Sequence, residues 1–487
     1  MFEEAELVYN RVPASVSQWV DGLRLQMTIG GIEADAASAR IVHPGDGSTY
    51  FDYPEAAERH AAASVEAAAK AFGDWSQTPW EARSALLNRL ADAMWDNRET
   101  LTLLVAAETG RPLRRAFSEV FFAVDYVRTI AAQVLAEVDY SRAGLKARLV
   151  HRPLGVAVAI APWNGPVILA VAKLANALLA GDTLVLRPAP QTPLSALYLG
   201  MLGRDIFPAG VLNVVTGDAS VGAALVQHPD VAKISFTGST DTGRKIAAAA
   251  APGLKRLTLE LGGNDAAIVL ADADVESVAS TVYRISLENA GQFCAAIKRL
   301  YVHVSLYDAV RDRILALAAR AVAGSAFDPA STLAPLQSAA QRTRVQGFVD
   351  DAVARGGRVL GHPLAHAGGG FFMAPVLVEK CRADFPLVAD EQFGPALPII
   401  PFDDAEEALR AANSNPFGLG GSVWGQDVDR AVALAERMRC GTAWVNQHGA
   451  YSAALPMAFA GQSGLGMDYG HFGVAEHSRA MLINARL

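Results

Sequence analysis

The chain has 487 residues, more than a single hydrophobic core usually supports, so its length predicts two or three domains. Apolar residues make up 51% of the sequence and charged residues 19%, which is typical of a folded globular protein. The formal net charge of −8 gives no general attraction to nucleic acid or to an anionic membrane surface, so neither partner is expected.

The start of the chain and its few cysteines favour a cytoplasmic protein. Residues 2–6 (FEEAE) are acidic, whereas a secretory signal begins with basic residues followed by an apolar stretch. The three cysteines, Cys294, Cys381 and Cys440, are too widely spaced for a disulfide framework or a metal-binding CxxC pair. We therefore expect a reducing compartment and no metal site.

A helical front section is followed by alternating strands and helices. From about residue 54 to residue 108, apolar residues recur every three or four positions, which is the helical period. Four short, buried-strand patterns then follow: LGVAVAIAP (154–162), DTLVLRP (182–188), VLNVVTG (211–217) and KISFTGS (233–239). Helix-length segments at 167–180 and 193–206 separate them, so the order predicts an α/β fold with a doubly wound parallel sheet that binds a nucleotide.

A second α/β domain is predicted further along the chain. Its strand candidates are AAIVL (266–270), RLYVHV (299–304), LPIIPF (397–402) and TAWVN (442–446). Two isolated strand patterns, at 138–152 and 479–485, fit a small β element that bridges subunits. The predicted domains are a dinucleotide-binding domain (1–131 and 154–261), a catalytic domain (262–460) and a bridging element (132–153 and 461–487).

Four local motifs carry residues suited to catalysis. Cys294 lies in ENAGQFCAAIKR (288–299), just before a predicted strand, and Glu260 ends the apolar strand of LTLELGGND (257–265). Asn164 follows the first sheet strand in IAPWNGP (160–166). In SFTGSTDTG (235–243) a strand, a turn and a helix follow one another, as expected where a helix N-terminus receives a phosphate. Taken singly, each motif also fits an inert core cysteine, a surface carboxylate or a plain turn.

Together, in this order and spacing, the four motifs resemble the aldehyde dehydrogenase superfamily, and the resemblance covers nearly the whole chain. It extends to LRPAPQTP (186–193), FPAGVLNVVTG (207–217), DEQFGPALPI (390–399), NPFGLGGSVW (415–424) and GQSGLG (461–466). The resemblance implies NAD(P)-dependent oxidation of an aldehyde to a carboxylic acid, in a homodimer or homotetramer.

The resemblance also assigns roles to residues. Cys294 would attack the aldehyde, Asn164 and the backbone N–H of Cys294 would hold the oxyanion, and Glu260 would activate the water that hydrolyses the thioester. Lys173 and Asp468 would form a proton relay, with an aspartate where many relatives have glutamate. The cofactor would contact Trp163, Arg187, Gly217, Phe236, Thr237, Gly238, Ser239, Leu261, Glu391 and Phe393.

Two departures from the family pattern concern the cofactor and the substrate. Pro190 stands where many relatives have the glutamate that grips the adenosine ribose, which leaves NAD and NADP both open with NAD favoured. Gly165 and Ala172 replace larger residues and enlarge the pocket, which favours a bulky apolar or aromatic aldehyde. The predicted pocket comprises Gly165, Leu169, Ala172, Glu288, Phe293, Met457 and Phe459, with Glu288 expected to be solvated at its mouth.

Two alternatives stay open at this point. One is a CoA-acylating semialdehyde dehydrogenase, although such members usually lack the base that Glu260 supplies. The other is a catalytically silent member with a structural or binding role, which the joint presence of Cys294, Glu260 and Asn164 disfavours. Cys381, Cys440, His448, His477 and Asp265 are interpreted as ordinary structural or polar residues.

Overall fold

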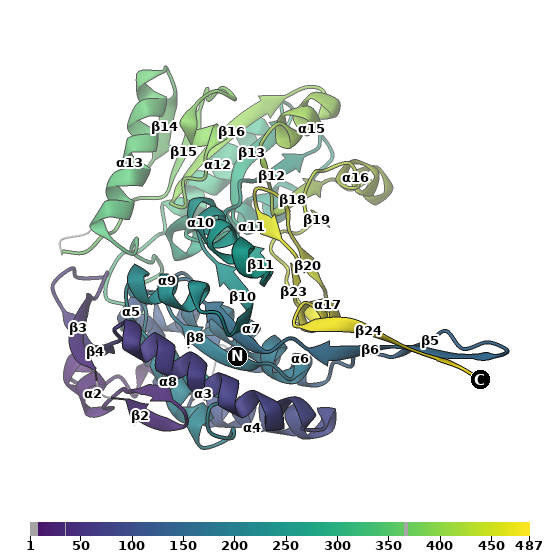
Figure 1. The fold of residues 1–487 in the computed structure, drawn as a ribbon. Coiled ribbons are helices and arrows are strands. Elements are labelled where there is room, and N and C mark those ends of the chain that lie inside the picture. The colour runs from purple at the N-terminus through teal and green to yellow at the C-terminus, as the bar shows by residue number, and fades with distance from the viewer. Residues whose placement is uncertain (1–7, 35, 365–368) are drawn as a thin grey trace.

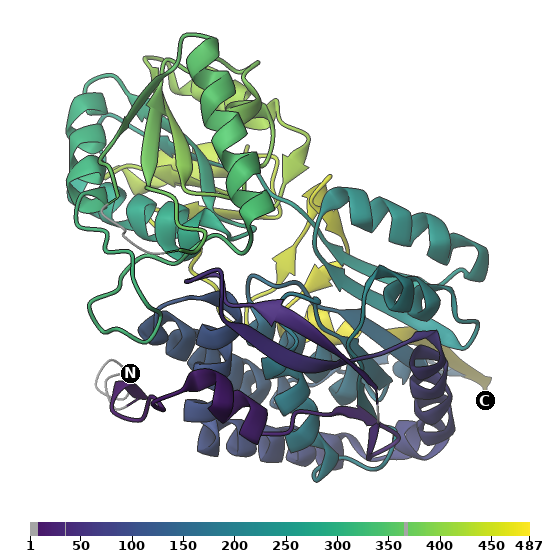
Figure 2. The ribbon, with the colours of Figure 1, turned by 90° about the vertical axis from the view of Figure 1, so that its left-hand side faces the viewer.

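Two α/β lobes and a small β element make up the molecule (Figure 1). The computed structural model describes residues 8–34, 36–364 and 369–487. Figure 2 shows from a second side that the two lobes lie next to each other, with C-terminal strands (yellow) between them. Side chains from both lobes can therefore meet in one site.

The sheet of the first lobe has the strand order β2-β1-β9-β8-β7-β10-β11-β22. Its strands are β1 (Met27–Ile29), β2 (Ile32–Ala34), β7 (Val156–Ile160), β8 (Thr183–Arg187), β9 (Leu212–Val214), β10 (Val231–Thr237), β11 (Arg256–Glu260) and β22 (Gly464–Leu465). The five central strands, which are β9, β8, β7, β10 and β11, run parallel, as the sequence predicts. The edge strands β1, β2 and β22 pair antiparallel, so the sheet is mixed at both ends.

Helices cover both faces of this sheet. They are α2 (Val16–Gly22), α3 (Glu58–Gln77), α4 (Trp80–Asp96), α5 (Arg98–Thr109), α6 (Leu113–Ala131), α7 (Pro166–Ala180), α8 (Leu194–Arg204), α9 (Ala219–Gln227), α10 (Thr240–Ala250) and the short η1 (Ala251–Gly253). The predicted apolar helix is α7, which starts with Pro166 at its first position and ends at Gly181 in the left-handed conformation. Within the described residues, no helix has both the length and the apolarity needed to cross a membrane.

The helical front section starts later than predicted. Residues 54 and 55 end strand β4 (Tyr50–Glu55), which pairs antiparallel with β3 (Ala37–Val42), and the first helix after them begins at Glu58. The reason is local, because a proline favours an extended conformation in the residue before it. Tyr53, which precedes Pro54, is accordingly held in the strand.

The sheet of the second lobe has the order β14-β15-β16-β13-β12-β18-β19, with only β14 antiparallel to its neighbour. Its strands are β12 (Asp265–Val269), β13 (Ile297–His303), β14 (Arg358–Gly361), β15 (Val376–Glu379), β16 (Ala396–Phe402), β18 (Gly420–Trp424) and β19 (Thr442–Val445). Its helices are α11 (Val275–Leu287), η2 (Glu288–Gly291), α12 (Tyr307–Ala318), α13 (Ala339–Ala354), α14 (Pro386–Ala389), α15 (Ala405–Asn413) and α16 (Val428–Ala435). The four predicted strands are present, whereas β14, β15 and β18 were not anticipated.

An extended arm projects from the first lobe (Figure 1). It consists of β5 (Val138–Asp139), β6 (Leu145–Pro153) and the C-terminal β24 (Ser478–Arg486), with β24 antiparallel to β6 along its whole length. These are the two isolated strands expected from the sequence. The remaining elements lie near the lobe boundary: the pairs β17 (Phe417–Gly418) with β21 (Ala460–Gly461) and β20 (Met457–Ala458) with β23 (Met467–Asp468), and helix α17 (Gly470–Ala475).

Candidate active site

Cys294 and Glu260 meet where the two lobes face each other. Cys294 lies in the turn directly before β13 of the second lobe, and Glu260 is the last residue of β11 in the first. The Sγ atom of Cys294 lies 3.2 Å from Oε1 of Glu260, and Thr237 Oγ1 donates to the other carboxylate oxygen at 2.9 Å. Both side chains are buried. The structure thus brings the predicted nucleophile and base into direct contact.

Burial controls the ionisation of this pair. It raises the pKa of the Glu260 carboxyl, an effect that the Lys173 ammonium opposes. Burial also raises the pKa of the Cys294 thiol well above its usual value, and the negative charge of Glu260 adds to the effect. The thiol therefore rests protonated and donates to the carboxylate, which is the acceptor placed to take its proton.

Asn164 reaches the cysteine loop from the end of β7. Its side-chain Nδ2 donates to the backbone carbonyl of Gln292 at 3.2 Å, and its backbone carbonyl accepts from Arg111 at 3.1 Å. Arg111 forms a buried ion pair with Glu119 at 2.7 Å. Removing one partner of such a pair costs about 3–5 kcal/mol, because the other charge stays buried. The ion pair therefore fixes the backbone that carries Asn164.

Glu119 also holds the first turn of α7. Its Oε1 accepts from the backbone N–H groups of Val167 and Ile168, two groups at the helix start that lack an intrahelical acceptor. Sequence reasoning missed both Arg111 and Glu119. In the sequence, Arg111 stands just before the apolar helical segment 113–131 and Glu119 lies within it. This pattern fits a buried ion pair and two solvated charges equally well.

The two residues predicted to form a proton relay, Lys173 and Asp468, lie close to each other and both influence the pKa of Glu260. Lys173 is buried, donates to Ser235 Oγ at 3.3 Å and lies 3.9 Å from a carboxylate oxygen of Asp468. Asn176, one helical turn after Lys173 on α7, donates to the other Asp468 oxygen at 2.8 Å. The aspartate thus reaches the lysine despite being one methylene shorter than glutamate.

A dinucleotide fits the residues at the carboxyl ends of the first sheet. Ser239 caps α10 by accepting from the Thr242 N–H, and it is exposed at the amino end of this helix. Arg187 donates to the carbonyls of Gly217 and Asp218 at 2.7 and 2.8 Å, while its buried Nε has no hydrogen-bond partner among the described residues. The exposed N-terminus of α10 suits a phosphate group of such a cofactor, and the unpaired Nε–H of Arg187 suits a phosphate or ribose oxygen.

The predicted nicotinamide side of this cleft is linked to the cysteine loop by Lys298. Glu391 accepts from the Gly263 N–H at 3.0 Å and lies 3.3 Å from Lys298 Nζ. Phe393 packs edge-on against Trp163, with ring centroids 5.4 Å apart. Lys298 was not predicted. It is buried and donates to the carbonyls of Phe293 and Cys294, so it joins Glu391 to the nucleophile.

The other predicted cofactor residues lie along the same edge. Phe236 and Thr237 are the last residues of β10, and Leu261 follows Glu260 at the end of β11. Gly238 lies so close to the Phe236 ring that a side chain at this position would collide with it. Gly217 adopts a left-handed φ of 119°, which requires glycine.

An aromatic and apolar cluster surrounds the thiol. Its buried members are Cys294, Ala295, Leu419 and Met457, and its partly buried members are Phe293, Tyr451, Phe459 and Tyr469. Three predicted pocket residues are in this cluster, whereas both tyrosines and Leu419 were missed. The Tyr451 hydroxyl is buried without a hydrogen-bond partner in the described part of the chain.

The remaining predicted pocket residues lie on or beside α7. Gly165 precedes the helix and Leu169 is partly buried in its first turn, whereas Ala172 is buried in the core of the first lobe. The side chain of Glu288 lies outside the described residues, although its backbone forms the start of η2.

Tyr469 has a φ of 66°, a left-handed conformation that a bulky residue rarely adopts.

Comparisons with known proteins agree with this geometry. The model described as "Aldehyde dehydrogenase family" matches residues 32–483. The phenylacetaldehyde dehydrogenase of Pseudomonas fluorescens is 36% identical over 472 residues, which cover 93% of this chain and 94% of that protein.

Solved structures agree equally well. An NAD+ complex of an aldehyde dehydrogenase from Bacillus cereus has a TM-score of 0.92 and 32% identity, covering 95% of this chain and 96% of its own. An NADP-dependent enzyme from E. coli has a TM-score of 0.92 and 30% identity, and the match covers 95% of this chain and 98% of that chain. With a family match over most of its length and a cysteine, a carboxylate and an amide brought together as predicted, this chain belongs to the aldehyde dehydrogenase family.

Proposed function

We propose that the protein oxidises a bulky apolar or aromatic aldehyde to the carboxylic acid through a thioester on Cys294. The observation that carries the proposal is the 3.2 Å contact between Cys294 Sγ and Glu260 Oε1. The cofactor is NAD or NADP, as for the relatives above, and we favour NAD. When bound, it supplies the hydride acceptor.

In the first half of the reaction, the sulfur of Cys294 forms a bond to the aldehyde carbon while the thiol proton passes to Glu260. The carbonyl oxygen becomes an oxyanion, which accepts from the Asn164 amide and the backbone N–H of Cys294. A preorganised donor of this kind is worth about 3–4 kcal/mol. Loss of hydride from the carbon then leaves a thioester on Cys294.

Before the second half, Glu260 must lose the proton that it took from the thiol, and we propose that Lys173 and Asp468 carry this proton away. Glu260 then takes a proton from water, whose oxygen attacks the thioester carbon. The carbon–sulfur bond breaks, the acid leaves, and Glu260 passes the proton taken from water to the Cys294 thiolate. A buried base beside the thiol supports hydrolysis by water, rather than acyl transfer to CoA, as the final step.

The substrate class follows from the residues around the thiol. Six of the eight cluster members are aromatic or large apolar side chains, among them Phe293 and Tyr451, whose ring centroids lie 6.3 Å apart. A phenyl or branched chain buries more apolar surface here than a methyl group does. The relation to a phenylacetaldehyde dehydrogenase supports the same class.

A substrate panel tests this assignment. We expect kcat/KM for phenylacetaldehyde or a terpenoid aldehyde to exceed that for acetaldehyde by at least about tenfold, since each buried methylene contributes about 10- to 200-fold. Reduced cofactor is followed by absorbance with NAD and NADP in parallel, and the product is identified with and without CoA. Acetaldehyde as the best substrate would overturn the substrate class, and formation of acyl-CoA would overturn hydrolysis.

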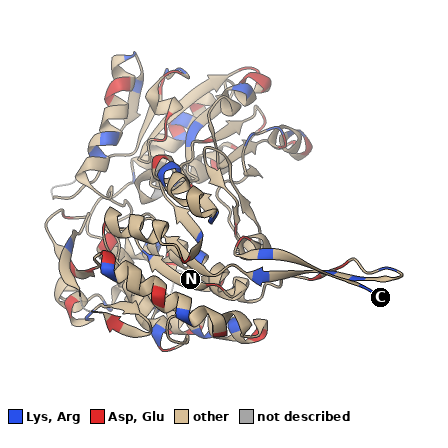
Figure 3. Ribbon diagram, in the orientation of Figure 1, with Lys and Arg blue, Asp and Glu red and all other residues tan. Residues whose placement is uncertain are grey.

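We further propose that the domains follow the predicted boundaries and that the arm joins subunits into a homodimer or homotetramer. The arm exposes apolar side chains on strands that leave the body of the molecule, among them Val138, Tyr140, Met481 and Leu482. Figure 3 shows Lys and Arg at the base of this arm, whereas charges of both signs are intermixed elsewhere. Exposed apolar strand surface of this kind is typical of an interface.

Replacing Leu482 by aspartate is expected to lower the molar mass measured by light scattering during gel filtration, because a charge would be buried in the interface. Leu254 is more exposed, at 90%, and lies in the turn that ends η1. The matched variant L254D should therefore keep the wild-type mass. An unchanged mass for L482D would contradict the role of the arm.

A further inference from the structure

The backbone carbonyls around the nucleophile are held one after another by side chains. The Gln292 carbonyl accepts from Asn164 and Asn289, and those of Phe293 and Cys294 accept from Lys298. The next carbonyl, that of Ala295, accepts from Nε2 of His448 at 3.0 Å. Four consecutive peptide planes, 292–295, therefore have their orientation fixed from outside the loop.

We propose that His448 is a positioning residue which, supported by Ser422 and Asp265, fixes the 295–296 peptide, the second peptide after the nucleophile. This inference rests on the proposed function, in which Cys294 is the attacking group. His448 is 1% exposed and comes from the loop after β19, far from Cys294 in sequence. Within the described part of the chain, His448 forms no hydrogen bond with the thiol or with Glu260. It therefore acts on Cys294 through the backbone of the nucleophile loop.

The hydrogen-bond network places a hydrogen on Nε2 of the imidazole. A carbonyl oxygen can only accept, so Nε2, which faces Ala295, is the donor. The other ring nitrogen, Nδ1, lies 3.0 Å from Ser422 Oγ, and this hydroxyl accepts from the Trp424 indole N–H at 3.0 Å. Ser422 therefore holds the second nitrogen of the ring, and both ring nitrogens have a partner.

Asp265 reinforces this orientation. Its Oδ2 lies 3.6 Å from Nε2 of His448, and neither of its buried oxygens has a hydrogen-bond partner within the described ranges. The carboxylate attracts the positive end of the Nε2–H dipole. It would repel a ring turned to present a lone pair there, because an unpaired buried charge interacts strongly with nearby dipoles.

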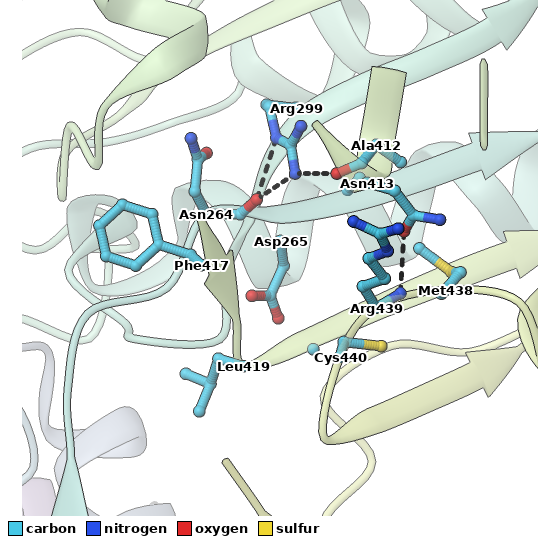
Figure 4. Close-up of a pocket in the computed structure, with 12 residues that line it drawn as sticks. Asn264, Asp265, Arg299, Ala412, Asn413, Phe417, Leu419, Met438, Arg439 and Cys440 are labelled. Atoms are coloured by element: carbon cyan, nitrogen blue, oxygen red, sulfur yellow. Dashed lines mark hydrogen bonds between the residues drawn. The ribbon is translucent and has the colours of Figure 1, made fainter. Parts of the chain in front are cut away.

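The carboxylate occupies a space that two glycines leave open. Asp265 lines a narrow cavity whose other walls include Leu419, Gly420 and Cys440 (Figure 4). A side chain at Gly420 would collide with the Asp265 carboxylate, and one at Gly263 would press against both Asp265 and the Cys294 carbonyl. The aspartate and the nucleophile loop are therefore packed against one stretch of backbone.

Fixing this peptide controls where the thiol points. The turn is closed by a hydrogen bond from the Ala296 N–H to the Phe293 carbonyl at 3.1 Å, so Cys294 lies within it. The Ala295 carbonyl and the Ala296 N–H belong to the same peptide, so if this peptide rotates, the Ala296 N–H leaves the Phe293 carbonyl. The turn then opens, and the Cys294 side chain within it is no longer held against Glu260. A misplacement of about 1 Å at a reacting group lowers the rate by about 100-fold.

The test compares His448→Leu, which removes the donor, with His448→Gln, whose amide can donate to the same carbonyl. We expect H448L to lower both the burst rate of reduced cofactor and the rate of Cys294 alkylation by iodoacetamide about 10- to 100-fold. The KM for the cofactor should change less than about threefold, since the donor does not face the predicted cofactor residues. H448Q should recover most of both rates.

The matched control for H448L is His43→Leu. His43 is also buried and also binds a backbone carbonyl, that of Ala107 at 2.8 Å, but it lies in the first lobe away from the nucleophile loop. Its loss is expected to lower the midpoint of thermal unfolding while leaving the alkylation rate of Cys294 unchanged. This separates a positioning role from a general loss of packing.

Each outcome decides the proposal. Wild-type burst and alkylation rates in H448L would overturn it, as would equal losses in H448L and H448Q. If H448L does not fold, Ser422→Ala carries the test, because it keeps the imidazole but removes the partner of Nδ1, and an unchanged alkylation rate would then overturn the proposal. A Cys294→Ser variant that keeps full activity would instead contradict the proposed function itself.

Discussion

Replacement of Cys294 by alanine is expected to abolish aldehyde-dependent formation of reduced cofactor. The thiol supplies the atom that bonds to the aldehyde carbon, and neither Cys381 nor Cys440 belongs to the cluster of side chains around it. Loss of a nucleophile of this kind lowers kcat by about a millionfold. The measurement is the absorbance of reduced cofactor after mixing with phenylacetaldehyde.

Cys381→Ala and Cys440→Ala are the matched controls. Burial raises the pKa of both thiols, to about 11 for Cys381 and about 12 for Cys440. Their sulfurs donate to backbone carbonyls, which cannot take the proton, whereas Cys294 donates to the Glu260 carboxylate. Both variants should retain the wild-type burst. If C294A keeps more than about one thousandth of the wild-type activity, the proposed mechanism is wrong.

Replacement of Glu260 by glutamine is expected to separate the two halves of the reaction. The glutamine side chain fills the same space but cannot accept a proton from water, so the thioester should accumulate. Glutamine cannot take the thiol proton either, so the burst of reduced cofactor should form more slowly than in the wild type but still approach one equivalent per active site. Turnover after the burst should be slowed about 100- to 10,000-fold. Rapid mixing measures the burst, and mass spectrometry detects the acyl group on Cys294.

The same carboxylate predicts how turnover depends on pH. Burial raises the pKa of Glu260, and only its ionised form can act as a base, so turnover should rise with pH through a value above the ordinary carboxyl range. This rise should disappear in E260Q. In D468N it should move to lower pH, since Asp468 is one of the charges that raise the pKa of Glu260. An unaltered profile in both variants would exclude Glu260 as the base.

The sequence predicted the parts of the site that chemistry restricts most tightly. Cys294, Glu260 and Asn164 occur in motifs whose glycines and strand patterns locate them at the ends of β13, β11 and β7, and the structure brings them to one place. The central parallel strands were equally predictable, because continuous apolar runs are typical of strands buried on both faces.

Residues that act through the backbone could not be predicted in the same way. His448 and Arg111 bind main-chain carbonyls of segments far from them in sequence, and Lys298 binds carbonyls of the loop just before it. A carbonyl has no sequence signature. The interpretation of His448 and Asp265 as ordinary polar residues was therefore incomplete, because their partners are defined only by the fold. Strand β18 was missed for a related reason: its two glycines suggest a turn, yet they make room for Asp265 and Met438.

The left-handed backbone of Tyr469 has a consequence for engineering this enzyme. Such a conformation costs about 1–3 kcal/mol in a residue with a side chain, and glycine would relieve it. The same change would remove a ring that packs against Tyr126 and Tyr451 in the cluster around the thiol, and loss of a buried aromatic side chain costs about 3–5 kcal/mol. The packing therefore outweighs the backbone strain, and a glycine at this position would lower the stability of the chain.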